Sequence, residues 1–249
     1  MEIASQNGKK WIKTQSGVKV IDARKSPFEL KEPNWVSDKD VERCQDCYMI
    51  FNMMNRRHHC RRCGRIFCDR CSSYYYSIPR MGFVDPVRNC RKCAVTARNE
   101  RDFFQRDIRI LRGGAHVNVW QQNRPNTAES RRTPSNPVSA VCYLDDTRWV
   151  LMISSGSCDY HFSEIPLSAI KSYWTEGQVR EAFTGTSSMT ITFDDGNLLE
   201  TRFSACEPPY KEVALKWLTA LQRAMDTLPV RNVESATKLT NCEIPEHFC

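Results

Sequence analysis

The feature that most constrains this chain is a set of four Cys-x-x-Cys pairs within fifty residues. Each pair can supply half of a tetrahedral thiolate site, because Zn²⁺ prefers four soft ligands at about 2.3 Å. Two zinc sites follow. The four-residue gap between the second and third pairs favours a cross-brace over sequential pairing. The predicted ligands are Cys44, Cys47, Cys68 and Cys71 for one ion, and Cys60, Cys63, Cys90 and Cys93 for the other.

Metal is a better explanation of these cysteines than disulfides. The N-terminus has no apolar signal-peptide core, Glu2 argues against N-myristoylation, and Cys249 is misplaced for a prenylation box. No apolar run approaches the ~20 residues of a membrane span. We therefore expect a cytosolic protein, and clustered cysteines in a reducing compartment indicate metal binding. The segment has few aliphatic residues, so the two Zn²⁺ ions should supply most of its folding free energy.

The positive charge of the chain is concentrated in the same segment. The formal net charge is +7, and residues 35–98 hold 13 Lys and Arg against 6 Asp and Glu, which leaves the remainder neutral. Two zinc ions and eight thiolates lower the charge of the segment to about +3, because metal-site charges belong in the sum. A basic patch on the finger survives this correction.

The residues between the cysteines form three motifs. Trp35-Val-Ser-Asp38 precedes the first pair, Arg56-Arg-His-His-Cys-Arg-Arg-Cys-Gly64 spans the second, and Arg88-Asn-Cys90 opens the fourth. This pattern resembles the FYVE zinc-finger family, with its WxxD, RRHHCRxCG and RVC elements. It departs from the family at Asn89, where the family has valine. The resemblance implies binding of phosphatidylinositol 3-phosphate on endosomal membranes.

A phosphomonoester on a sugar ring needs convergent cationic donors, and arginine offers planar bidentate hydrogen bonds to phosphate oxygens. The resemblance implies roles for individual residues. Arg57, Arg61 and Arg88 would hold the 3-phosphate, Arg56 would favour the 1-phosphate, and Asp38 and His59 would meet ring hydroxyls, with His58 completing the headgroup site. By contrast, Arg62, Arg65 and Arg70 are predicted to be solvated surface charges.

Two methionines, Met53 and Met54, lie just before the basic motif. In the family this position is an exposed apolar loop that enters the bilayer interface, so we expect the pair to insert into the membrane. The alternative is that the methionines pack against Phe51 in the interior of the finger.

The rest of the chain is predicted to form a second domain. We expect an N-terminal tether at 1–33, the finger at 34–96, a connecting helix at 97–112, a pleckstrin-homology-like domain at 113–229 and a tail at 230–249. Seven short apolar runs with turns between them predict antiparallel strands. One face of a C-terminal helix carries Val213, Ala214, Trp217, Leu218, Leu221, Met225 and Leu228. The fold class is therefore α+β, the second domain resembling a pleckstrin-homology-like seven-stranded antiparallel barrel or sandwich with a C-terminal helix.

The resemblance extends to the order of tether, finger, helix and second domain, and it implies a non-catalytic adaptor that is peripheral on endosomal membranes, with a role in endosomal signalling or focal-adhesion turnover. The second domain would contact a protein or a lipid, and Arg124, Arg131 and Arg132 form its basic cluster. The alternatives are a protein-interaction module and a RING-like ubiquitin ligase, which also cross-braces two zinc ions. A nucleic-acid partner is disfavoured by Asp38 and the WxxD element. We find no nucleophile, paired catalytic carboxylates or open metal position, so we do not expect an enzyme.

Overall fold

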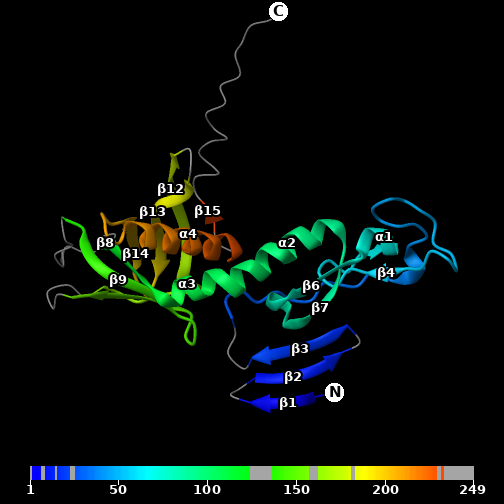
Figure 1. The fold of residues 1–249 in the computed structure, drawn as a ribbon. Coiled ribbons are helices and arrows are strands. Elements are labelled where there is room, and N and C mark those ends of the chain that lie inside the picture. The colour runs from blue at the N-terminus through cyan, green and yellow to red at the C-terminus, as the bar shows by residue number, and fades with distance from the viewer. Residues whose placement is uncertain are drawn as a thin grey trace, which may run out of the picture. The chain divides into compact units, whose positions relative to one another are not determined.

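The computed structural model describes residues 2–6, 9–14, 16–22, 26–123, 136–156, 162–180, 183–228 and 231–232. It divides into two compact units, Met1–Gln105 and Arg106–Cys249, called here the finger unit and the sheet unit (Figure 1). Most of the predicted tail, and the predicted basic cluster of the second domain, lie outside the described residues. No described helix combines the length and the apolar character needed to span a membrane.

The finger unit is built from short elements held by its cysteines. A two-stranded sheet pairs His58 with Phe67 and His59 with Ile66. A longer hairpin pairs Tyr75 with Arg88. The elements are η1 (Asp38–Asp40), β4 (His58–His59), β5 (Ile66–Phe67), α1 (Asp69–Ser72), β6 (Tyr74–Ile78), η2 (Pro79–Met81) and β7 (Phe83–Asn89).

The segment predicted to be a tether instead contains three strands of the finger's own sheet. Strands β1 (Glu2–Gln6), β2 (Lys9–Thr14) and β3 (Gly17–Asp22) extend it in the order β1-β2-β3-β7-β6. The Val20 N–H donates to the Gly82 carbonyl at 2.8 Å. Gly82 has φ of +78°, and a Cβ there would lie 2.5 Å from the Val20 carbonyl oxygen, so only glycine fits. Strands β1 to β3, called here the N-terminal meander, are thus joined directly to the zinc finger.

The connecting helix begins earlier than predicted. α2 (Arg91–Asp102) starts directly after Cys90 and continues through a π-helical stretch, Phe103–Asp107, into α3 (Ile108–Gly113). Within the finger unit, the buried ring of Phe28 contacts the rings of Phe103 and Phe104 at centroid distances of 5.3 and 5.8 Å. These edge-on aromatic contacts anchor the segment between the meander and the finger.

The sheet unit is a mostly antiparallel sheet with a C-terminal helix, as the α+β prediction requires. Its strand order is β11-β10-β9-β8-β14-β13-β12-β15. The described strands do not close into a barrel, since β11 and β15 stand at opposite edges; the closed-barrel form of the prediction is not observed. The elements are β8 (Ala115–Asn123), β9 (Val138–Asp145), β10 (Val150–Ser155), β11 (Ile165–Pro166), η4 (Leu167–Ala169), β12 (Ile170–Arg180), β13 (Phe183–Asp194), β14 (Leu198–Ala205), α4 (Lys211–Thr227) and β15 (Arg231–Asn232).

Helix α4 packs most of its predicted apolar face on this sheet. Trp217 is fully buried, its ring lies 6.1 Å from that of Phe203, and its Nε1–H donates to the Leu111 carbonyl at 3.3 Å. Val213 departs from the prediction because 51% of its surface is exposed. The helix therefore fills the interior of the sheet unit from one side of the sheet.

Candidate metal centres and phosphate-binding site

The structure brings the eight clustered cysteines together in two groups of four. Within each group the sulfur atoms all lie within 4.8 Å of one another. The groups are Cys44, Cys47, Cys68 and Cys71, and Cys60, Cys63, Cys90 and Cys93. This is the cross-braced pairing that the sequence predicts.

The geometry of these groups fits Zn²⁺. Tetrahedral ligands about 2.3 Å from the ion stand about 3.8 Å apart, and the Cys47 and Cys68 sulfurs are separated by 3.6 Å. Hydrogen bonds among the cysteines of the second group lower the pKa of the Cys63 thiol and raise the pKa of the Cys90 and Cys93 thiols. A thiolate is the form that binds the metal. Four thiol donors per group, without a carboxylate or a histidine, are typical of a structural zinc site.

A close backbone contact fixes the turn after the second pair. Gly64 has φ of +71°, and a Cβ there would lie 2.4 Å from the Asn34 carbonyl oxygen. The Gly64 carbonyl in turn accepts the Val36 N–H at 3.0 Å. The WxxD segment is therefore held beside the second cysteine pair, and no residue with a side chain fits at position 64.

The structure brings two of the predicted phosphate-binding arginines close together. The backbone N–H of Arg61 donates to the carbonyl of Arg88 at 2.9 Å. The Arg61 guanidinium also donates through Nη1 to the His59 carbonyl at 2.7 Å. Burial and then the charge of Arg88 lower the pKa of Arg61. Two like charges held in this way favour an anion between or beside them.

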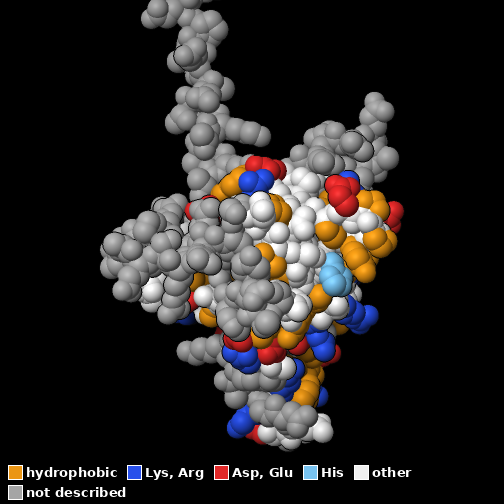
Figure 2. Space-filling view, turned by 90° about the vertical axis from the view of Figure 1, so that its left-hand side faces the viewer, with side chains coloured by type: hydrophobic (Ala, Val, Ile, Leu, Met, Phe, Trp, Pro, Cys, Tyr) orange, Lys and Arg blue, Asp and Glu red, His pale blue; other side chains and the backbone are white. Residues whose placement is uncertain are grey.

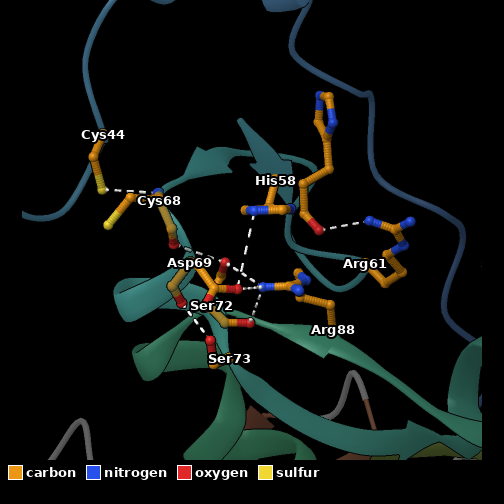
Figure 3. Close-up of polar contacts among 9 residues, drawn as sticks. Cys44, His58, Arg61, Cys68, Asp69, Ser72, Ser73 and Arg88 are labelled. Atoms are coloured by element: carbon orange, nitrogen blue, oxygen red, sulfur yellow. Dashed lines mark hydrogen bonds and ion pairs between the residues drawn. The ribbon is translucent and has the colours of Figure 1, made fainter. Parts of the chain in front are cut away.

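Asp69, an acidic side chain that the sequence analysis missed, contacts Arg88 of this pair. Arg88 Nη1 donates to Asp69 Oδ1 at 2.7 Å, and His58 Nε2 lies 3.9 Å from the same oxygen, as Figure 3 shows. The hydrogen bond from Arg88 holds the pKa of the Asp69 carboxyl below its usual range. Burial, followed by the charge of Arg88, lowers the pKa of His58. The only sequence signal for Asp69 is its place next to the predicted ligand Cys68.

Asp38 and His59, the two residues predicted to contact ring hydroxyls, lie close to each other. His59 Nε2 lies 3.9 Å from Asp38 Oδ1 and 2.7 Å from the Val36 carbonyl oxygen. The Trp35 ring lies 5.0 Å from the His59 ring and 5.2 Å from the Arg61 guanidinium. The WxxD segment (Trp35 to Asp38) thus packs beside His59 and Arg61 of the basic motif, residues 56–64.

The other two predicted headgroup arginines are placed differently. Arg57 donates through Nε to the Val41 carbonyl at 2.9 Å, and its guanidinium lies 5.0 Å from the centre of the buried Phe51 ring. Arg56 is exposed. Arg57 is therefore held by the finger, whereas Arg56 presents its charge to solvent.

One arginine of the basic motif has a structural role instead of the predicted solvated one. Arg62 Nη2 and Arg80 Nη1 both lie within 3 Å of Glu100 Oε1, at 2.9 and 2.8 Å, and Glu100 is buried. Removing one partner of such a buried ion pair is costly. The prediction for Arg62 was wrong because Glu100 lies far along the chain, on α2.

Asn89, the departure from the family motif, is compatible with strand β7. It is fully buried, and its Nδ2 donates to the Val87 carbonyl at 2.7 Å. Tyr74 pairs with Asn89 across the hairpin, so the strand is intact at this position. The carboxamide replaces the apolar contacts of valine with a hydrogen bond to the backbone.

A cavity of about 510 Å³ opens beside Arg61. Its lining combines the finger with the N-terminal meander and the segment that follows it. The residues are Thr14, Ser16, Glu32, Trp35, His59, Arg61 and Phe83. Sequence reasoning assigned no role to Ser16, whose Oγ accepts a hydrogen bond from Arg61 Nε at 2.9 Å. No local pattern could have paired these two residues.

The two methionines before the basic motif are at the tip of an exposed loop. Met53 and Met54 are 91% and 95% exposed, whereas Phe51 is buried. The Asn52 side chain accepts the N–H groups of Met54 and Asn55 at 2.9 and 2.8 Å, which fixes the turn. Exposed Tyr48, Met49 and Ile50 are close in sequence. The structure does not support packing of the methionines against Phe51.

Comparisons with known proteins agree with the geometry of the finger. The FYVE zinc finger family model matches residues 34–99. This segment is therefore a FYVE zinc finger, a class that binds two Zn²⁺ ions, and the chain holds the two four-cysteine groups required.

Curated relatives match this chain over a limited part of its length. Lateral signaling target protein 2 of Caenorhabditis elegans is 42% identical over 97 residues, which cover 39% of this chain and 15% of that protein. The probable inactive serine/threonine-protein kinase slob1 of Dictyostelium discoideum is 37% identical over 89 residues, covering 35% of this chain and 15% of that protein. This chain thus spans only 15% of the length of either relative.

Solved structures of FYVE domains are also similar. The solution structure of the LM5-1 FYVE domain from Leishmania major is 36% identical, covers 28% of this chain and 82% of that chain, and gives a TM-score of 0.26. The VHS and FYVE tandem domains of Hrs, a protein involved in membrane trafficking and signal transduction, are 34% identical. They cover 27% of this chain and 30% of that chain, with a TM-score of 0.26.

Proposed function

We propose that this chain is a non-catalytic adaptor that binds phosphatidylinositol 3-phosphate through its FYVE finger at endosomal membranes. The observation that carries the proposal is the pairing of Arg61 with Arg88, held by a 2.9 Å backbone hydrogen bond. The two guanidiniums are close enough for the charge of Arg88 to lower the pKa of Arg61. A phosphomonoester would relieve this repulsion and satisfy several N–H donors at once.

The acidic residues at the site support selectivity for a single phosphate on the inositol ring. Asp69 already contacts Arg88 and His58, and Asp38 lies 3.9 Å from His59. Both carboxylates are exposed. A headgroup with further phosphates would meet one or both of them, and like-charge contact rejects such ligands.

The exposed methionine loop supports binding at a membrane surface as well as headgroup binding. Met53 and Met54 are separated from the arginines of the basic motif by Asn55 alone, and they are 91% and 95% exposed. Apolar side chains that enter the interface add to an electrostatic contact with lipid headgroups. The loop would therefore insert while the basic motif binds a phosphate.

For the sheet unit we propose a protein partner. The start of α4 carries Tyr210 and Val213, which are 50% and 51% exposed, and the Tyr210 ring lies 4.5 Å from the ring of His116. The face of the molecule seen in Figure 2 carries charged side chains of both signs among hydrophobic ones. This mixture suits a protein surface better than an anionic membrane. The role in focal-adhesion turnover stays a prediction.

The test is sedimentation of the full chain with phosphatidylcholine vesicles that contain one phosphoinositide at a time. We expect binding to vesicles with phosphatidylinositol 3-phosphate, and a loss of about tenfold or more in Arg61→Ala, since a charge-assisted bidentate contact disappears. Arg98→Ala, an exposed arginine on α2, is the matched control and should bind like the unchanged chain. Binding that Arg61→Ala leaves intact would favour the protein-interaction alternative.

A further inference from the structure

The tight connection between β2 and β3 places Ser16 at the cavity beside Arg61. Thr14 pairs with Gly17 across the connection. The Thr14 hydroxyl donates to the Gly17 carbonyl at 2.8 Å and accepts the N–H of Ser16 at 3.2 Å. The turn is thus held by its own hydrogen bonds, and Ser16 Oγ lies 2.9 Å from Arg61 Nε.

The serine oxygen occupies an acceptor position that the proposed headgroup phosphate would use. Ser16 and Arg61 line the same cavity of about 510 Å³, which leaves room for a phosphate group. A neutral hydroxyl is a much weaker acceptor for a guanidinium than a phosphate oxygen. In the unmodified chain the lipid can therefore displace the hydroxyl from Arg61.

A phosphate ester on Ser16 would be the same chemical group as the 3-phosphate of the lipid, attached to the protein itself. It would bring a charge of about −1.5 to −2 and three strong acceptor oxygens to Arg61. We propose that Ser16 is a phosphorylation site, and that its phosphate occupies the Arg61 end of the cavity and excludes the lipid headgroup. This inference rests on the proposed function of the finger.

The surroundings of Ser16 suit such a modification. Ser16 is half-exposed in a tight turn, and three lysines, Lys9, Lys10 and Lys13, precede it in the sequence. A serine kinase that prefers basic substrates would transfer the terminal phosphoryl group of a nucleoside triphosphate. The Ser16 Oγ–phosphorus bond forms, the bond from that phosphorus to the bridging oxygen breaks, the nucleoside diphosphate leaves, and the hydroxyl proton passes to the kinase's base.

The one acidic residue among those that line the cavity does not oppose the phosphate strongly. Glu32 is ion-paired with Lys19, whose side chain lies within the same unit. The pair is neutral overall, so a phosphate on Ser16 meets the charge of Arg61 with little net repulsion from Glu32.

The experiment compares three forms of the full chain: unmodified, with phosphoserine installed at position 16, and with phosphoserine installed at position 5. Ser5 is the matched control because it is exposed on β1 of the same meander and does not line the cavity. The probe is phosphatidylcholine vesicles with and without phosphatidylinositol 3-phosphate. We expect the phosphate at Ser16 to weaken binding about tenfold or more, the phosphate at Ser5 to leave it unchanged, and phosphatase treatment to restore it.

Equal binding by the unmodified chain and by the chain phosphorylated at Ser16 would overturn the inference. Failure of the unmodified chain to bind these vesicles would instead refute the proposed function. A lipid-independent measurement separates the two cases: ³¹P NMR should show a lower second pKa for phosphoserine at position 16 than at position 5, because Arg61 favours the dianion. Coincident titration curves would show that the phosphate does not reach Arg61.

The remaining measurement concerns the modification itself. Mass spectrometry of the chain recovered from cells treated with phosphatase inhibitors should find a phosphate on Ser16. A chain that carries no phosphate there under these conditions would overturn the assignment of Ser16 as a modification site, even if the installed phosphate blocks lipid binding.

Discussion

The cysteine cluster of the finger unit and the interior of the sheet unit are filled with different chemistry. Of the eight buried residues in the described cluster around the cysteines, only Phe51, Ile66 and Phe67 are not cysteines. The sheet unit instead buries aromatic and aliphatic side chains, among them Phe193, Phe203 and Trp217, between its sheet and α4. The cysteine cluster therefore depends on metal ligation for its stability. The sheet unit depends on apolar burial, as does the smaller cluster of Ile78, Met81, Phe83 and Val87 in the finger unit.

This difference predicts that the stabilities of the two units respond to different perturbations. A metal chelator withdraws Zn²⁺ from its thiolate ligands and does not act directly on hydrocarbon packing. A cavity in an apolar core leaves the zinc ligands unchanged. The first two predictions below apply one perturbation each, and the last two examine how the finger divides membrane binding between apolar and charged groups.

The largest effect is expected from zinc removal. Structural zinc contributes about 10–16 kcal/mol to the folding of small fingers, so a strong chelator should unfold residues 34–99 and abolish vesicle binding. The sheet unit should keep its own cooperative thermal transition. Near-UV circular dichroism with calorimetry of the full chain measures both. An unchanged near-UV spectrum after complete zinc removal would contradict the claim that the finger depends on metal ligation for its stability.

The second largest effect is expected from a cavity in the apolar core of the sheet unit. Trp217→Ala removes a fully buried side chain and should lower the free energy of unfolding of the sheet unit by about 3–5 kcal/mol. The zinc content should remain at two ions per chain. Val213→Ala on the same helix, where 51% of the side chain is exposed, serves as the control and should change stability by less than about 0.5 kcal/mol. Zinc loss in Trp217→Ala would show that the units are coupled.

A smaller effect is expected from changing the methionine loop, and it distinguishes insertion of the loop into the membrane from binding of the lipid headgroup. Replacing Met53 and Met54 by serine should weaken vesicle binding by about tenfold or more, since each buried CH₂ contributes about 0.8 kcal/mol, while binding of the soluble inositol 1,3-bisphosphate headgroup stays the same. Val95→Ser, an exposed apolar position on α2, is the control. Equal losses for vesicles and headgroup would mean that the loop shapes the site instead of entering the membrane.

The smallest effect concerns pH. Burial and Arg88 lower the pKa of His58 from its ordinary 6.5 in the free finger, and a bound phosphate should raise it. The complex then binds more protons than the free protein, so the affinity should increase as the pH falls from 8 to 6, by a few-fold. Liposome titrations of the unchanged chain and of His58→Gln measure the difference. Parallel pH profiles for the two would remove His58 from the proposed binding mechanism.

The sequence predicted the metal groups correctly because ligand spacing is a local property with few solutions. Six of the seven apolar runs between His116 and Phe203 likewise fall in strands of the sheet unit, since alternation and turns are read within each strand. The run from Tyr160 to Ile165 lies partly outside the described residues, and of its described part only Ile165 is in a strand. What escaped prediction depends on partners far apart in the chain. β3 contacts β7 through Lys19 and Phe83, and Arg62 pairs with Glu100. The edge strand β1 is exposed throughout, so it carries no alternation that could have revealed it.

The pairing of β3 with β7 has a practical consequence for dissecting this protein. The segment that matches the FYVE family begins at residue 34. The finger unit, however, begins at Met1. A fragment cut at residue 34 would lose three strands, leave the edge of β7 open to pairing with other chains, and take Ser16 away from Arg61. Such a fragment would also lack the site of the proposed Ser16 phosphate, so its lipid affinity would be insensitive to that modification.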